Sequence, residues 1–282
     1  MTLSSLSQIA ALLPKNFDDF TTSFPKTTES AEAVYQGFDS LLTQYAELDP
    51  TNIQMGVVVS MGFGAQSSWV ESYILAAAGH LSSSLADLRR AIEFACYSMK
   101  ASKSKERASD WVNQGSDAEA RKRFALSCAI PLCYEGNKYR NLRELIVQYE
   151  TANYYGAHGN MQTLIQRLTV DNKGLGFLLH VPKKERSPDA FTTVLTGYRI
   201  LQVFRDALSP SIRDTQKFKA VMDYIKQQIR EARLAMAEVE FGGAVPDHVY
   251  RTICLDENPS MDIEFRKIIA EARERKSKPK DV

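Results

Sequence analysis

The chain of 282 residues has little of several residue types that mark special classes of protein. Its four cysteines are too few for a disulfide scaffold, and 14 glycines with 10 prolines exclude a collagen-like or low-complexity chain. Because hydrophobic residues make up 44% and the net charge is only +1, the chain is not intrinsically disordered. The composition predicts a globular protein, and the length allows one large domain or two small ones.

Long hydrophobic runs are also missing. The longest apolar stretches, 57–59 and 73–78, are far shorter than the ~20 residues that a membrane-spanning helix needs. The first residues lack the basic segment and the cleavage site of a signal peptide. We therefore expect a soluble, cytoplasmic protein with no membrane partner and with reduced thiols at Cys96, Cys128, Cys133 and Cys254.

The small net charge hides an uneven distribution. Residues 1–60 carry two lysines against seven acidic residues, whereas the last 18 residues carry seven basic residues against three acidic ones. The balance of the whole chain excludes a surface that is basic throughout, as a general polyanion binder would have. The basic tail has two interpretations: a solvated helix end, or a local surface that contacts nucleic acid or a membrane.

Apolar residues recur at spacings of three and four along most of the chain, which predicts an all-α helical bundle. We expect helices over about 28–48, 66–99, 138–155, 189–208, 211–240 and 260–276, with shorter ones within 103–125. Because Pro14 and Pro25 interrupt the start, we expect three regions: an irregular N-terminal lead-in over 1–28, a single bundle domain over 29–240, and a C-terminal loop, helical appendage and basic tail over 241–282.

Two segments depart from the helical period. Between about 162 and 181, two β-rich runs flank Asp171-Asn172-Lys173-Gly174, which predicts a small β-hairpin insertion that packs on the helices. The run 62–67, rich in glycine, follows Val57-Val58-Val59 and superficially matches a dinucleotide-binding turn. No second parallel strand follows it, so we interpret this run as a tight turn before the helix that begins near Gln66.

Metal-binding and nucleophile motifs are missing. The four histidines share no ligand spacing, and Cys128 and Cys133 lie on either side of Pro131 rather than forming a zinc knuckle. The sequence therefore predicts no metal and no cofactor.

The candidate site lies in the stretch 149–160, which closes a core helix. Asn153 occupies the apolar stripe of that helix, and a buried amide requires hydrogen-bond partners. Gly156 and Gly159 flank His158 and would present its imidazole. On the central helix, Arg89 lies one turn before Glu93. These four polar residues can meet between the two helices, with binding contacts from Tyr149, Tyr154 and Asn160.

Each of these residues also has a purely structural interpretation. Arg89 and Glu93 are spaced as an ordinary i, i+4 ion pair, which stabilises a helix by a few tenths of a kcal/mol. His158 can cap the helix that ends near Tyr155. Tyr149, Tyr154 and Tyr155 can be packing residues rather than a platform on which bases stack.

Three features carry a resemblance to a known family: the run Leu88-Arg89-Arg90-Ala91-Ile92-Glu93-Phe94, the run Gly-Ala-His158-Gly-Asn, and the hairpin followed by a helix. Over about 66–208 the chain resembles a group of uncharacterised bacterial helical-bundle proteins related to HEPN domains. HEPN ribonucleases share an Arg-polar-x3-His motif that cleaves RNA without a metal. Asn153 stands here at the position of that arginine, and many HEPN-like proteins are non-catalytic partners.

Two functions follow as expectations. The first is a non-enzymatic protein that forms a homodimer or binds an unknown protein partner through its bundle. The apolar spacing of 218–239 would either seal the bundle or form the dimer seam. The second is a HEPN-like metal-independent ribonuclease or nucleotide-binding protein, in which His158 is the general acid or base and Arg89 stabilises charge on phosphate.

Overall fold

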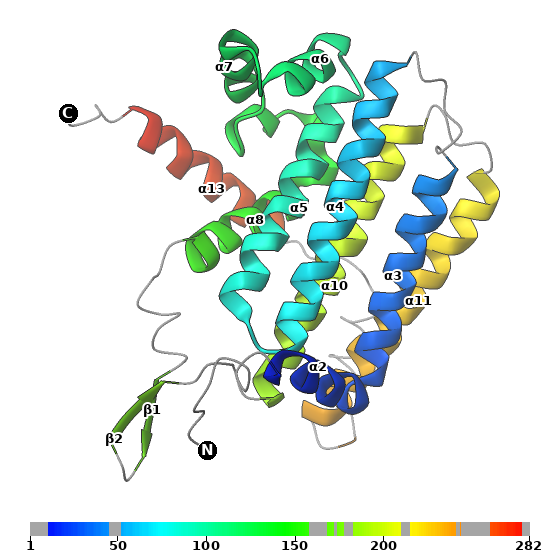
Figure 1. Ribbon diagram of the computed structural model, residues 1–282, viewed down its shortest axis with the longest axis vertical. Coiled ribbons are helices and arrows are strands. Elements are labelled where there is room, and N and C mark those ends of the chain that lie inside the picture. Colours follow the sequence, from blue (N-terminus) through cyan, green and yellow to red (C-terminus); the bar gives the residue numbers. More distant parts are fainter. Residues whose placement is uncertain are drawn as a thin grey trace.

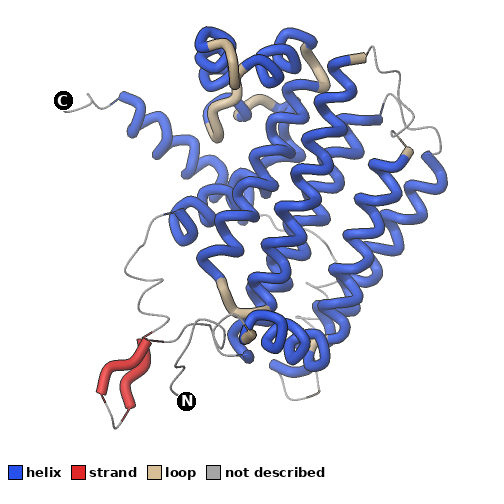
Figure 2. The backbone as a smooth tube through the Cα atoms, viewed as in Figure 1, coloured by secondary structure: helices blue, strands red, loops and turns tan. Residues whose placement is uncertain are grey.

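A computed structural model describes residues 11–44, 52–157, 168–171, 174–177, 183–209, 215–240, 243 and 260–277 of the chain. The prediction of an all-α helical bundle is confirmed (Figures 1 and 2). The long helices that run side by side are α3 (Pro25–Thr43), α4 (Ile53–Ala77), α5 (Leu81–Ala101), α10 (Lys183–Leu208) and α11 (Thr215–Glu240).

Shorter elements cover the ends and one side of this bundle. The short helices that the sequence predicts within about 103–125 form as α6 (Lys105–Asn113) and α7 (Ala118–Ser127). They lie at one end of the bundle, and α2 (Leu12–Ser23) lies at the other end (Figure 1). On the α5 side, the chain forms the 3-10 turns η1 (Leu132–Tyr134) and η2 (Asn137–Leu142), then α8 (Arg143–Ala152) and the π-helical turn η3 (Asn153–Ala157). The C-terminal α13 (Ser260–Ser277) packs on α8.

The core is centred on Trp69 of α4, where α3 and α10 meet. Its buried indole stacks against Phe38 of α3 and against Tyr73, with ring centroids 5.8 and 6.5 Å away. The indole nitrogen Nε1 donates a hydrogen bond to the backbone oxygen of Thr193 in α10, at 2.8 Å. This bond satisfies the one polar group of the ring and fixes α10 against α4.

The single helix predicted over 66–99 is wrong: the chain forms two helices, α4 and α5, which pack against each other. They are separated at Gly79, whose φ of +86° is a conformation that glycine adopts without steric cost. The tight turn predicted at 62–67 is also wrong, because this run lies inside α4. Its glycines serve close packing instead, since a Cβ on Gly62 would lie 2.5 Å from Leu42 Cδ2 and one on Gly64 would lie 2.9 Å from Phe94 Cε2.

The irregular lead-in predicted over 1–28 is also corrected, because residues from Leu12 onward are helical. Pro14 is the third residue of α2, and Pro25 is the first residue of α3. The first turn of a helix does not use its backbone N–H groups, so proline is tolerated there. The two prolines therefore stand where helices begin.

Two short strands lie within the predicted hairpin segment. Strand β1 (Leu168–Asp171) pairs antiparallel with β2 (Gly174–Phe177), so that Leu168 faces Phe177 and Asp171 faces Gly174. Figure 1 draws them apart from the helices of the bundle, whereas we expected them to pack on it.

The buried part of the stripe on α11 seals the bundle and is therefore not available as a dimer seam. Ile225 and Ile229 are buried within the single chain, and α11 packs along α3. A Cβ added to Gly37 of α3 would lie 2.6 Å from Ile225 Cδ1, so the two helices approach closely. A homodimer stays a prediction, without this seam. No helix in the described ranges combines the length and the apolar character that crossing a membrane requires.

Candidate functional site

Arg89 and Glu93 lie on the face of α5 that is turned toward α8. Arg89 Nε donates to Glu93 Oε1 at 3.1 Å, which confirms the predicted i, i+4 pair. Both side chains are partly exposed, so the pair alone contributes little to stability. Its effect is to hold the guanidinium group in one orientation.

Tyr149 of α8 joins this pair from the opposite helix. Its hydroxyl donates to Glu93 Oε1 at 3.2 Å, and the Arg89 guanidinium lies over its ring, 5.5 Å from the centroid. Burial raises the pKa of Tyr149, and the charge of Glu93 adds to this shift, whereas a hydrogen bond from Asn153 and the charge of Arg89 oppose it. Tyr149 is therefore a neutral donor near pH 7, and Glu93 accepts hydrogen bonds from two elements at once.

Asn153 begins the π-helical turn that follows α8. The turn leaves Asn153 half-buried, and its side chain is near enough to Tyr149 that a hydrogen bond from it lowers the pKa of that hydroxyl. The predicted contact of Asn153 with His158 lies outside the described residues. The next residue, Tyr154, is 59% exposed and packs edge-on against Tyr155, with ring centroids 4.9 Å apart. The turn thus places a packed amide and an open aromatic ring next to each other.

Helix α13 forms the third side of the candidate site, next to α5 and α8. Phe265, Ile269 and Ala272 are buried, at the spacing of one helical face. One turn further on, Arg275 Nη2 lies 3.7 Å from Glu150 Oε2 of α8, and Lys276 is exposed beside it. The apolar stripe of α13 therefore sets where its basic C-terminal end lies.

These elements enclose one groove of about 680 Å³, lined by α5, the segment 130–132, α8 with its π-helical turn, and α13. Three cationic side chains and one carboxylate line it: Arg89, Arg275, Lys276 and Glu150. Tyr149, Asn153 and Tyr154 add two aromatic rings and an amide. Cations bind phosphate oxygens, tyrosine rings stack on bases, and an amide can hydrogen-bond a base edge. The groove is thus equipped for a nucleotide, whose parts need all three.

The structure brings together most of the predicted site. Arg89, Tyr149, Asn153 and Tyr154 line the groove, and Glu93 lies behind Arg89. His158 and Asn160 lie outside the described residues, so their predicted roles in catalysis and binding stay predictions. Among the residues that the structure describes, no three His, Cys, Asp or Glu side chains cluster as metal ligands.

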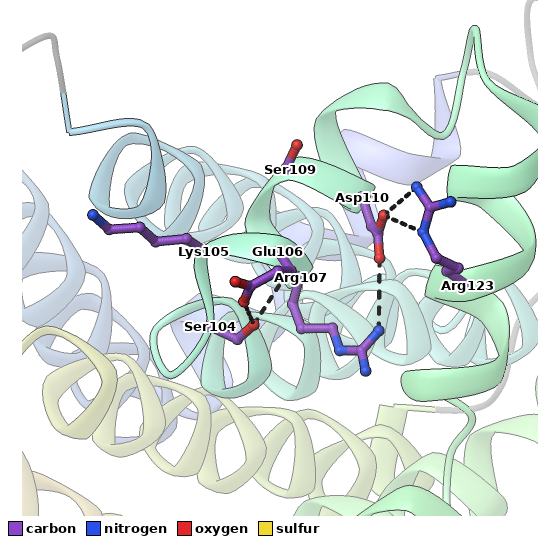
Figure 3. Close-up of a pocket in the computed structure, with 7 residues that line it drawn as sticks. All are labelled: Ser104, Lys105, Glu106, Arg107, Ser109, Asp110 and Arg123. Carbon is purple, nitrogen blue, oxygen red and sulfur yellow. Dashed lines mark hydrogen bonds and ion pairs between the residues drawn. The ribbon is translucent and has the colours of Figure 1, made fainter.

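A second hollow lies at the α6–α7 end of the bundle (Figure 3). Asp110 is buried, and its Oδ1 accepts a hydrogen bond from Arg123 Nε at 2.9 Å and lies 2.8 Å from Arg123 Nη2. Its Oδ2 lies 3.6 Å from Arg107 Nη1. Glu106 accepts a hydrogen bond of 2.6 Å from Ser104, which caps α6. The ion pairs of Asp110 therefore hold α6 to α7, so we assign this hollow a structural role.

Comparison of the chain with protein-family models, with curated proteins and with solved structures finds no match. The HEPN resemblance therefore stays a prediction from the motifs alone.

The sequence did not predict the contribution of α13 to the groove. Arg275 and Lys276 belong to the basic stretch at the end of the chain, but a run of charges does not reveal which surface it will face. The available signal was the apolar spacing of Phe265, Ile269 and Ala272. It indicates that α13 docks on a surface, and only the tertiary structure identifies that surface as α8.

Proposed function

We propose that the protein is a non-enzymatic helical-bundle protein that binds a nucleotide unit, free or within single-stranded RNA, in the groove between α5, α8 and α13. The convergence of three cations and an exposed tyrosine carries this proposal. Arg275 and Lys276 contact phosphate, and the base stacks on Tyr154. Arg89 is already oriented by Glu93 and Tyr149, so it loses little conformational freedom when a ligand binds.

Fluorescence anisotropy with a labelled single-stranded RNA tests the proposal. We expect Arg275→Gln with Lys276→Gln to weaken binding about tenfold and to reduce the slope of log K against log salt by about 1.4, because two phosphate contacts are lost. Tyr154→Ala should weaken binding with little change in that slope, since stacking releases no counterions.

The matched control removes the same charge from exposed lysines of α11, on the other side of the bundle (Figure 1). Lys219→Gln with Lys226→Gln should bind RNA as the unmodified protein does. Equal weakening in both double variants would mean attraction to net charge only and would refute the groove. A free nucleoside monophosphate that competes with RNA at the same site would assign the groove to single nucleotides.

A second candidate function is metal-independent RNA cleavage. It is favoured because Arg89 lines the same groove as Asn153, and Asn153 stands five residues before His158 in the sequence. In this case Arg89 stabilises developing charge on phosphate, and His158 transfers the proton. Incubation of the protein with total RNA and EDTA tests this candidate. Cleavage that is lost in His158→Ala would support it, whereas equal cleavage by both proteins, or none by either, would refute it.

A further inference from the structure

Three lysines converge on one buried ring near the C-terminal end of α5. The ammonium nitrogens of Lys100, Lys103 and Lys138 lie 5.0, 5.0 and 5.1 Å from the centroid of Tyr139. Any two of them are therefore within about 10 Å of each other. A ring has only two faces, so at least two of the lysines share one. We call these three residues the lysine cluster.

The surrounding structure fixes the ring beneath the lysine cluster. Tyr139 packs edge-on against buried Tyr134, with ring centroids 5.2 Å apart. Lys100 Nζ lies over both rings and donates to the backbone oxygen of Cys133 at 2.9 Å. Lys100 therefore has a structural role, whereas Lys103 and Lys138 are exposed and extend over the ring of Tyr139. The attraction of ammonium groups to the tyrosine faces holds like charges together.

In the described part of the chain, no acidic side chain forms an ion pair with the lysine cluster. Partial burial lowers the pKa of Lys103, and the charges of Lys138 and Lys100 lower it further, while Asp206 opposes them. Asp206 is already occupied: Oδ1 accepts from Arg205 Nε and Nη2 at 2.9 and 2.7 Å, and Oδ2 accepts from Asn141 Nδ2 at 2.8 Å. Glu135, which lies between η1 and η2, contacts Arg273 of α13. The lysine cluster thus carries an excess of positive charge.

We propose that the lysine cluster binds a compact polyanion with closely spaced phosphate groups, that is, a polyphosphate chain. Each ammonium group offers three donors on a flexible stem, and three such groups within 10 Å of one another can bind neighbouring phosphates together. Binding would also relieve the repulsion among the lysines. The site shares no residue with the groove, so the proposal does not depend on the function proposed above.

Isothermal titration calorimetry with inorganic tripolyphosphate, at low salt and without a divalent cation, tests the proposal. We expect measurable binding that falls at least tenfold in the double variant Lys103→Gln with Lys138→Gln. Lys100 is left in place because it holds Cys133. Both substituted side chains are exposed, so the circular dichroism spectrum and the melting temperature should match those of the unmodified protein.

Two controls define the outcome. Lys219→Gln with Lys226→Gln removes the same charge elsewhere and should keep full affinity, and orthophosphate should bind at least tenfold more weakly than tripolyphosphate. Absence of tripolyphosphate binding, equal loss in the two double variants, or equal affinity for orthophosphate would each overturn the proposal.

The source of the phosphate chain is decided by further titrations. A nucleoside triphosphate and an RNA carrying a 5′-triphosphate both contain this chain, and an RNA with a 5′-hydroxyl is the matched control. Of the nucleoside triphosphate and the 5′-triphosphate RNA, the one that binds more tightly is the ligand, provided that Lys103→Gln with Lys138→Gln weakens its binding. If neither binds more tightly than tripolyphosphate, the ligand is the chain itself. Equal binding by the 5′-hydroxyl RNA would overturn the assignment to closely spaced phosphates.

Discussion

Replacing Gly197 by alanine should destabilise the bundle at its centre. Gly197 lies where α10 crosses Trp69 of α4, and an added Cβ would lie 2.8 Å from Trp69 Cδ1 and still nearer to Nε1 and Cε2. The indole cannot move aside, because it stacks against Phe38 and Tyr73 and donates its N–H to the backbone of α10. Either the ring or α10 must shift, and each shift breaks packing on both sides.

The size of the effect follows from three contributions. Overpacking of a core costs about 1–3 kcal/mol, and a buried indole N–H that loses its acceptor costs about 1–3 kcal/mol more. Alanine favours a helix over glycine by about 1 kcal/mol, which offsets part of the loss. We therefore expect the free energy of unfolding to fall by about 1–5 kcal/mol, with the middle of this range near 3 kcal/mol, against the 5–15 kcal/mol that is typical of folded proteins.

Urea unfolding followed by circular dichroism measures this change as a lower midpoint at an unchanged slope. The matched control is Gly56→Ala, a glycine within helix α4, where an added Cβ meets no atom within 4 Å. Only the gain in helix propensity applies there, so this variant should be up to about 1 kcal/mol more stable than the unmodified protein. If Gly197→Ala unfolds at the same midpoint as Gly56→Ala, α10 does not lie against Trp69 as described.

Two further predictions concern buried tyrosines. The hydroxyl of Tyr134 is buried without a hydrogen-bond partner in the described part of the chain, so Tyr134→Phe should leave stability unchanged or raise it by about 1 kcal/mol in calorimetric melting; a clear loss would reveal an unrecognised partner. Burial raises the pKa of Tyr73 from 10.0 to about 12, so the folded state holds the proton more tightly. The contribution of Tyr73 to the free energy of unfolding should be complete below pH 10. It should fall by about 2–3 kcal/mol as the pH rises toward 12. Tyr73→Phe should unfold with a flatter dependence on pH in that range, and identical slopes for the two proteins would refute this reasoning.

The apolar spacing in the sequence predicts which segments are helical better than it predicts where each helix begins and ends. The apolar spacing continues in phase from Ala77 to Leu81, so the stripe alone cannot distinguish a straight helix from a reversal at Gly79. Pro14 and Pro25 are compatible with an irregular segment and equally with the first turn of a helix, where proline is tolerated. In each case the local sequence pattern is compatible with two backbone conformations. Which of them forms depends on what packs against the segment.

The candidate site divides in the same way. The contact between Arg89 and Glu93 follows from helical spacing within one element, and a polar partner for Asn153, here Tyr149, is expected for an amide in an apolar stripe. Both were accessible from the sequence. The meeting of Arg275 with Glu150 depends on how α13 docks on α8, and the lysine cluster depends on how η2 folds back beside the end of α5. Contacts between residues far apart in sequence carry no local signal.

Helix α5 connects the groove to the lysine cluster. Arg89 and Lys100 are separated by 11 residues, about three turns, so they lie on the same side of the helix roughly 16 Å apart. Each lies over a tyrosine of the segment that returns along α5, Arg89 over Tyr149 and Lys100 over Tyr139. Arg89 is also paired with Glu93, whereas Lys100 is partly buried against tyrosine faces and has no ion pair in the described part of the chain. Unpaired positive charge therefore collects at the lysine cluster. The acidic excess of residues 1–60 offsets that charge in the total, and a net charge of +1 is therefore compatible with polyanion binding on one side of the bundle.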